Sequence, residues 1–369
     1  MTLPPHPPSS NSGTNNRTLQ LRFPSVKCEA ECMSRSPVIS VVVTAYSRRQ
    51  FLRGAIESVL RQTLDRHEYE VIVLKDFEEN TLDSFLDKGG VRVYHDEMKV
   101  GRVLARGIRL ARGDIVCFLD DDDEFLPTKL NYVKTVFDDD PGLGYLHNSF
   151  IVDNGGLTTT RPTSQPPSGK RITFNSMHTP GRRLKLRAPW FGFNLSSVSV
   201  RKKWVLGLLP LLEQIEAAIS DGFFIVAALS KGIRATIDPA VLTVYRYHDS
   251  STHFLDADSD RNAVREREHM SKLMRSWFVI QRLAEGTPME AVLRYDFIYW
   301  RIRQSLFDEA AQLRLGPADV AFFIRGGILR GSLHPFYLLP AYLATRVAPR
   351  TVRALFQLVG TRFGHKWVT

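Results

Sequence analysis

The sequence predicts an α/β protein in which helices flank a mixed, mainly parallel sheet, followed by a helical C-terminal extension. Two observations support this fold class. Short apolar, β-branched runs alternate with amphipathic helical segments through residues 38–137, the order typical of right-handed βαβ units. The runs are apolar throughout, as in strands that a sheet buries on both faces. A hydrophobic content of 43% and a charged content of 24% fit a globular protein of 369 residues.

Four strands with three intervening helices are expected in the first third of the chain. The strands are the apolar runs 38–44, 69–74, 91–94 and 115–119. The helices, where apolar residues recur at helical spacing, are 49–62, 81–86 and 102–112. Gly113 is expected to cap the last of these helices.

The same patterns continue less regularly in the rest of the chain. Strands are expected at 145–152, 195–200 and 241–247, and helices at 127–137 and 221–230. Residues 153–189 are polar, basic and rich in Gly, Pro and Thr, and a loop of this length is usually functional or disordered. The pattern is helical from 260 to 313, and a basic, aromatic tail follows at 317–369.

Composition divides the chain into three parts. Residues 1–36 are rich in Pro, Ser and Asn, which predicts a disordered tail, and Met33 is a candidate for the true start. The α/β domain is expected at 37–255. A helical, basic region is expected at 256–369.

The net charge of +10 is concentrated in two segments without any Asp or Glu, 154–212 and 320–369. Such segments suggest phosphorylated ligands, anionic lipid headgroups or nucleic acid. The three cysteines form neither a disulfide framework nor a zinc pattern, which is consistent with the cytoplasm. Apolar runs are too short for a membrane span, and the N-terminus lacks the apolar core of a signal peptide.

Four consecutive carboxylates, Asp120 to Asp123, directly follow the apolar strand 115–119. Charge cannot continue into a buried strand, so these residues are expected at its carboxyl end, where open α/β sheets bind ligands. Carboxylates this close repel one another unless a cation neutralises them. Mg²⁺ typically binds one or two carboxylates together with substrate phosphates. The alternative is a solvated acidic loop before the helix that begins at Pro127.

Four segments together resemble the inverting nucleotide-sugar glycosyltransferases of family 2. They are VISVVVTAYSRRQFLRGAIESVLRQT (38–63), VIVLKD (71–76), ARGDIVCFLDDDDEFLPTKL (111–130) and YRYHDSS (245–251). The resemblance implies a GT-A fold, with a Rossmann-like nucleotide-binding half at 37–150 and an acceptor half at 151–255. It also implies a divalent metal, Mn²⁺ or Mg²⁺, that stabilises the departing nucleoside diphosphate.

The resemblance assigns metal-binding roles to two segments. The DXD motif of the family falls on Asp120, Asp121 and Asp122. Asp122 is the expected direct ligand, and Asp120 and Asp121 are expected to contact the ribose or the metal. Asp123 either joins this set or caps the next helix. His248 matches a position that reaches the metal or the diphosphate, although a lone His is often structural.

Further donor contacts are implied at other strand ends. Thr44 and Tyr46 match positions that hold and stack on the base, and Asp76 matches a residue that contacts it. Uracil is the commonest base at such sites, whereas guanine and thymine remain open. Ala105 stands where many members have Asn, and Arg102 is expected to compensate by reaching phosphate. The structural alternatives are a loop aromatic for Tyr46 and a solvated Arg102.

An inverting transfer needs a general base for the acceptor hydroxyl. The segment SDGFF (220–224) resembles the acidic motif of the family, so Asp221 is the expected base. Ser220 and Asp221 alternatively form a plain helix N-cap. Glu213 and Glu216 are lesser candidates.

The expected activity is transfer of a sugar, first of all from a UDP-sugar, to a hydroxyl of a glycan or lipid-linked acceptor in cell-surface polysaccharide or glycoconjugate synthesis. The loop 153–189, with Trp190 and Phe191 after it, is expected to cover the site. The tail 317–369 either lies on the cytoplasmic membrane face or packs on the catalytic domain.

Two other functions compete with this one. A sugar-phosphate nucleotidyltransferase would need a Gly-rich loop after the first strand, but that loop reads AYSRRQ (45–50). A nucleic-acid-binding protein would fit the basic segments. The carboxylate cluster opposes a phosphate backbone, so no nucleic acid is expected as a partner.

Overall fold

The computed structural model describes residues 36–46, 49–97, 99–153, 158–159, 170–174, 194–217, 220–246, 259–287, 289–307, 313–348 and 351–352. The predicted tail 1–36 lies almost wholly outside this part of the chain, as do Met33, His248, Trp190, Phe191 and most of the loop 153–189.

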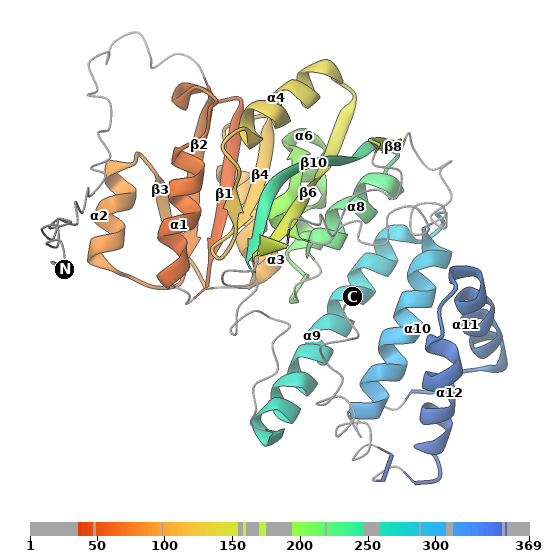
Figure 1. Cartoon of the computed structure of the whole chain (residues 1–369). Coiled ribbons are helices and arrows are strands. Elements are labelled where there is room, and N and C mark those ends of the chain that lie inside the picture. The colour runs from red at the N-terminus through yellow and green to blue at the C-terminus, as the bar shows by residue number, and fades with distance from the viewer. Residues whose placement is uncertain are drawn as a thin grey trace, which may run out of the picture. The chain divides into compact units, whose positions relative to one another are not determined.

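The described strands form one mixed sheet with the order β3-β2-β1-β4-β9-β6-β10-β5 (Figure 1). The strands are β1 (Ile39–Ala45), β2 (Tyr69–Lys75), β3 (Arg92–His95), β4 (Ile115–Asp120), β5 (Glu124–Phe125), β6 (Leu143–Asp153), β9 (Val198–Arg201) and β10 (Arg234–Arg246). Two short strands pair beside this path, β7 (Thr158–Thr159) with β6 and β8 (Ile172–Phe174) with β10.

Strands β1 to β4 are mutually parallel, as the sequence predicts. Strand β9 runs antiparallel to both β4 and β6, and β6 and β10 are parallel to each other. The sheet is therefore mixed and mainly parallel. The parallel order brings the carboxyl ends of β1, β2 and β4 to one edge, which positions the candidate site.

Alternation along the strands assigns the helices to two faces. Val41 and Val43 of β1 pack in a core with α1 (Arg49–Leu60), α2 (Asn80–Lys88) and α4 (Lys129–Asp139). Val42 packs in a second core with α3 (Val100–Leu110), α7 (Leu209–Leu212) and α8 (Ser220–Ser230). Between β9 and α7 lie the short helices α6 (Lys202–Val205) and η5 (Leu206–Leu208).

The C-terminal region is helical, as predicted. It contains α9 (Ser259–Ala284), α10 (Glu290–Phe307), α11 (Pro317–Arg330) and α12 (His334–Ala344). Val279, Ile280 and Leu283 of α9 belong to the same core as α8. Helices α10, α11 and α12 share a separate apolar cluster centred on Ile302 and Phe323.

Several predicted boundaries were wrong. The helix α3 ends at Leu110 with Ala111 as its C-cap, so Gly113 caps nothing. A Cβ at Gly113 would lie 2.7 Å from the carbonyl carbon of Ile39, so glycine is needed there for close approach to β1. The expected strand 195–200 begins as a 3-10 turn, η4 (Leu195–Ser197), because Asn194 has a φ of 72°. Strand β10 begins at Arg234, before an irregularity in its pairing at Asp238.

Gly101 joins α3 to the segment that leads to α8. Its N–H donates to the carbonyl of Ile215 at 3.0 Å, and an added Cβ would lie 1.9 Å from the carbonyl oxygen of Leu212. We expect Gly101→Ala to destabilise the fold by about 3 kcal/mol or more, at the upper end of overpacking. Gly207→Ala is the matched control, because its Cβ would meet nothing within 4 Å. Thermal denaturation checks this, and equal midpoints for the two variants would contradict the packing.

Candidate active site

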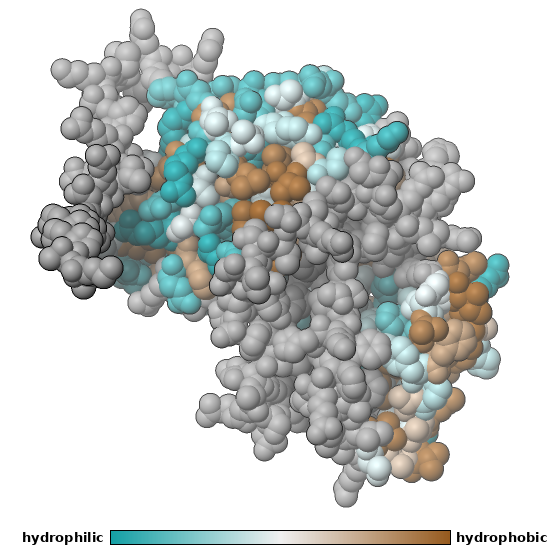
Figure 2. All heavy atoms as spheres, viewed as in Figure 1, coloured by the Kyte–Doolittle hydropathy of each residue, from teal (hydrophilic) through white to brown (hydrophobic). Residues whose placement is uncertain are grey.

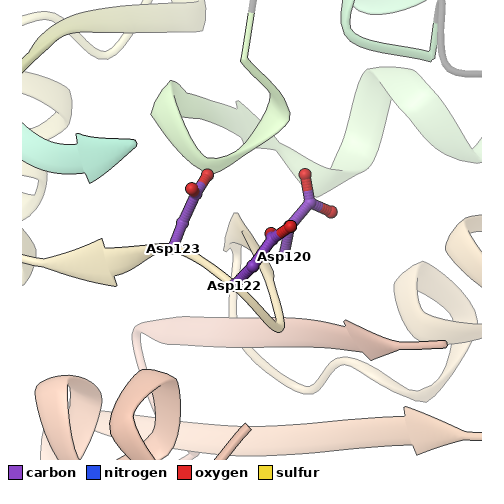
Figure 3. A group of neighbouring side chains, drawn as sticks. All are labelled: Asp120, Asp122 and Asp123. Atoms are coloured by element: carbon purple, nitrogen blue, oxygen red, sulfur yellow. The ribbon is translucent and has the colours of Figure 1, made fainter. Parts of the chain in front are cut away.

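Three carboxylates gather where β4 ends and turns toward β5. Ligand oxygens of Asp120, Asp122 and Asp123 all lie within 4.8 Å of one another. Figure 3 shows the three side chains pointing to the same side of the turn. Asp122 and Asp123 are buried and Asp120 is half-buried. Such a set of hard oxygen atoms fits a divalent cation, whose charge would relieve the repulsion among them.

Asp123 is the most deeply enclosed of the three. Burial, and then the charges of Asp122 and Asp120, hold its carboxyl pKa well above the usual range. Its Oδ1 accepts a hydrogen bond from the backbone N–H of Arg246 at 3.0 Å, and a hydrogen bond from the Ser196 side chain lowers the Asp123 pKa in part. The capping alternative for Asp123 is wrong, because α4 begins at Lys129 with Thr128 as its N-cap.

The end of β1 contacts the turn directly. Thr44 Oγ1 donates to Asp120 Oδ1 at 3.2 Å. The backbone N–H of Tyr46 donates to Asp121 Oδ2 at 3.0 Å, and the Asp121 N–H donates to the Thr44 carbonyl at 3.1 Å. Asp121 therefore joins the ends of β1 and β4. The Tyr46 side chain is 56% exposed, so its ring face is open to a ligand.

Two further predicted donor residues lie on the neighbouring elements. Asp76 is exposed directly after β2, the strand beside β1. Arg102 is exposed in the first turn of α3. Lys75, which stands before Asp76, is fully buried and pairs with Asp83 at 2.7 Å. Lys75 is therefore a structural residue and does not face a ligand.

Asp221 lies in the first turn of α8 and has an unusual pKa. Burial raises the pKa of its carboxyl to about 7, and the charge of Asp120 contributes in the same direction. The Gly222 N–H donates to its Oδ1 at 2.7 Å. Asp221 is the second residue of α8, which begins at Ser220. The fold thus brings Asp221 within electrostatic reach of the carboxylate cluster.

The two lesser candidates for a base are engaged elsewhere. Glu213 pairs with Arg109 at 2.5 Å. Glu216 pairs with Arg275 at 2.7 Å, and this guanidinium lowers the Glu216 pKa. A carboxylate stabilised in its charged form is a weak base, so Glu216 is less suited to the role than Asp221.

The sequence patterns did not indicate two residues, Ser196 and Lys129, that support the turn carrying the carboxylates. Ser196 Oγ accepts the N–H of Asp120 at 3.0 Å. Lys129 is fully buried and donates to the Ser196 carbonyl and, at 2.9 Å, to Thr243 Oγ1. Its burial lowers the pKa of its ammonium to about 7. No local signal distinguishes this Lys from a solvated one in the first turn of a helix.

A mixed sheet of this order, with a carboxylate cluster at its strand ends and helices on both faces, is the arrangement that the resemblance to GT-A proteins implies. Residues 40–205 match the family described as "Glycosyl transferase family 2", and curated proteins that match parts of the chain are named as glycosyltransferases. The predicted family, fold class and enzyme class are therefore confirmed.

Two relatives illustrate the extent of the similarity. The chain is 24% identical over 241 residues to an uncharacterized glycosyltransferase of Nostoc sp., a match that covers 63% of this chain and 71% of that protein. It is 30% identical over 142 residues to an uncharacterized glycosyltransferase of Haemophilus influenzae. This second match covers 37% of the chain and 48% of the relative, about half its length.

A solved structure extends the likeness of the fold. The chain is similar to S. aureus TarS 1–349, whose crystal structure is a complex with UDP, with a TM-score of 0.55. The match covers 87% of this chain and 91% of that chain at 16% sequence identity. At this identity the similarity establishes the fold alone.

Proposed function

We propose that the protein is an inverting glycosyltransferase that moves a sugar from a nucleoside-diphosphate sugar to an acceptor hydroxyl. The observation that carries the proposal is Asp221, a carboxyl with a pKa of about 7 within electrostatic reach of Asp120. A general base works best when its pKa lies near the working pH. The neighbouring cluster of three carboxylates supplies the charge needed to hold a cation beside a diphosphate.

In this proposal the donor binds across the carboxyl ends of β1, β2 and β4. Tyr46 stacks on the base, while Thr44 and Asp76 hold it. Arg102 reaches the diphosphate from α3. UDP is the first expectation for the nucleotide, and residues 37–150 form the nucleotide-binding half of a domain that extends to 255.

Asp122, Asp120 and Asp123 would hold a divalent metal, Mn²⁺ or Mg²⁺, with His248 as a further ligand. When bound, this ion would offset the negative charge that develops on the leaving diphosphate. Asp121 keeps the turn in place through its bonds to β1.

Asp221 performs the proton transfer. It accepts the proton of the acceptor hydroxyl while that oxygen forms a bond to the anomeric carbon. The bond from the anomeric carbon to the diphosphate oxygen breaks on the opposite face, and its electron pair leaves with the nucleoside diphosphate. Attack from the opposite face inverts the anomeric configuration.

A panel of nucleotide sugars tested with Mn²⁺ and Mg²⁺ checks the proposal. We expect metal-dependent release of nucleoside diphosphate, highest with a UDP-sugar. Release of pyrophosphate from a nucleoside triphosphate and a sugar 1-phosphate would instead identify a nucleotidyltransferase.

The acceptor in this proposal is a glycan or a lipid-linked glycan presented at a membrane surface. Helix α12 and the turn after it expose an apolar stripe at helical spacing, formed by Phe336, Pro340, Leu343 and Val347. Figure 2 shows hydrophobic side chains gathered over this part of the chain. Residues 320–369 contain no acid, so the stripe lies in a segment whose charge suits anionic headgroups.

No described helix is both long and apolar enough to cross a bilayer. The docking in this proposal is peripheral, on the cytoplasmic face. Phe336, Leu343 and Val347 of the stripe are 56%, 61% and 89% exposed.

We expect the double variant Phe336→Ser, Leu343→Ser to lose about tenfold or more in affinity for vesicles containing phosphatidylglycerol, because each buried apolar side chain is worth about 1.5–3 kcal/mol. Co-sedimentation measures this. Leu206→Ser is the matched control, because Leu206 is 43% exposed but lies outside the tail. Equal binding by the double variant and the control would contradict docking through α12.

A further inference from the structure

Arg246, the last residue of β10, makes three hydrogen bonds to the segment Asp122–Glu124. Its backbone N–H donates to Asp123 Oδ1 at 3.0 Å. Its Nη1 donates to the backbone carbonyl of Asp122 at 3.1 Å, and its Nη2 donates to Glu124 Oε1 at 2.5 Å. One residue thus contacts three consecutive positions that link the ends of β4 and β5.

The same guanidinium is fixed in place by two other segments. It lies over the ring of Phe51 in α1, with Cζ 5.3 Å from the ring centroid. Its Nε is 3.9 Å from Asp153 Oδ2 at the end of β6. The side chain is only 22% exposed. A planar guanidinium supplies several donors in a rigid geometry, which a lysine ammonium cannot reproduce.

The pairing of β5 explains why the turn needs this support. Strand β5 pairs with β10 at two positions only, Val244 with Glu124 and Thr243 with Phe125. The hydrogen-bonded pairing of β5 with β10 therefore does not extend to the turn that carries Asp122 and Asp123. Arg246 continues it by replacing the missing strand-to-strand bonds with bonds to Asp123 and to the Asp122 carbonyl.

We propose that Arg246 is a positioning residue that holds the turn in the geometry that ligates the divalent metal. This inference rests on the proposed function, because it requires a metal at Asp120, Asp122 and Asp123. The guanidinium bonds run to a main-chain oxygen and to Glu124, and not to the carboxylates of the cluster.

The direction in which the metal affinity changes when Arg246 is replaced distinguishes a positioning role from a purely electrostatic effect. Arg246 carries a positive charge beside a cation site, so Coulomb repulsion alone predicts that removing this charge tightens metal binding. Positioning predicts the opposite, since loss of residues that orient ligands typically weakens metal affinity about 10- to 100-fold.

The test is a titration of the full chain with Mn²⁺ alone. Electron paramagnetic resonance measures the free Mn²⁺, which gives the Kd. We expect Arg246→Gln to raise the Mn²⁺ Kd about 10- to 100-fold. Arg246→Lys keeps the charge but loses the paired donors, so its Kd should also rise. Arg234→Gln is the matched control, because Arg234 lies at the other end of β10 and pairs with Asp140. Its Kd should equal that of the wild type.

Thermal midpoints without metal show whether each variant is folded. If Arg246→Gln does not fold, the Mn²⁺ Kd of Arg246→Lys provides the test. Unchanged or tighter Mn²⁺ binding by a folded Arg246 variant would overturn the positioning role while leaving the metal site intact. Absence of Mn²⁺ binding by the wild type would instead overturn the metal site itself, and the inference with it.

Discussion

Asp221→Asn is expected to lower the rate of nucleoside-diphosphate release by about 10²- to 10⁴-fold, the usual contribution of a general base. Asparagine preserves the size of the side chain but cannot accept the proton of the acceptor. The KM for the donor should change little, because the donor contacts lie at other strand ends. Steady-state kinetics with the preferred nucleotide sugar measures both quantities.

The pH profile tests the same residue independently of the absolute rate. The base is active when deprotonated, and the pKa of Asp221 is about 7 in the absence of metal. Wild-type kcat/KM should therefore rise with pH to a plateau. Because a nearby cation would lower this pKa, the midpoint should fall at about pH 7 or below. The rise should be absent in Asp221→Asn.

Stability gives a readout that does not depend on activity. The folded-state pKa of Asp221 is raised, so between the unfolded pKa and about 7 the folded state binds the extra proton. Stability from this group therefore falls as pH rises through that window. Asp221→Asn cannot ionise, so its thermal midpoint relative to the wild type should increase from about pH 5 to about pH 8. A constant difference would contradict the burial of this carboxyl.

Asp122→Ala is expected to reduce metal-dependent turnover to background, because it removes a ligand and not a supporting contact. It should also abolish the rise in thermal midpoint that Mn²⁺ gives the wild type, an effect that follows from binding to the folded state alone. Without metal, the variant should be at least as stable as the wild type. The reason is that the charge of Asp122 raises the pKa of buried Asp123, so its removal relieves repulsion.

A control variant shows whether the effects of Asp122→Ala are specific to this position or follow from the loss of a carboxylate elsewhere in the protein. Asp138→Ala removes an acid that is 57% exposed and pairs with Lys134 on the surface of α4. Its turnover and its response to Mn²⁺ should equal those of the wild type. If Asp122→Ala retained a full thermal response to Mn²⁺, the proposed metal site would be wrong.

Local patterns were sufficient to predict much of the nucleotide half. β-branched runs located β1, β2 and β4, and the four aspartates were expected at the carboxyl end of β4. The role of Thr44 in the site was implied only by the resemblance. In the structure Thr44 Oγ1 lies 3.2 Å from Asp120 Oδ1. The proximity of Asp221 to the cluster was implied only by the resemblance, because about a hundred residues separate the two.

The remaining features depend on contacts between distant segments. Strand β9 lies antiparallel between β4 and β6, and nothing in its apolar sequence specifies that direction. Lys129 lies in the first turn of α4 like many solvated lysines, and its burial results from Ser196 and Thr243. Arg246 reaches Asp122 across more than a hundred residues. Charge or apolar periodicity along the chain cannot reveal such pairs.

Release of nucleoside diphosphate from the preferred nucleotide sugar, measured with and without Mn²⁺ for the wild type, Asp122→Ala and Asp221→Asn, tests whether the protein is a metal-dependent transferase with Asp221 as its base. We expect metal-dependent release by the wild type, background release by Asp122→Ala, and a slow, pH-independent rate for Asp221→Asn. Metal-independent turnover that neither substitution changes would contradict this assignment.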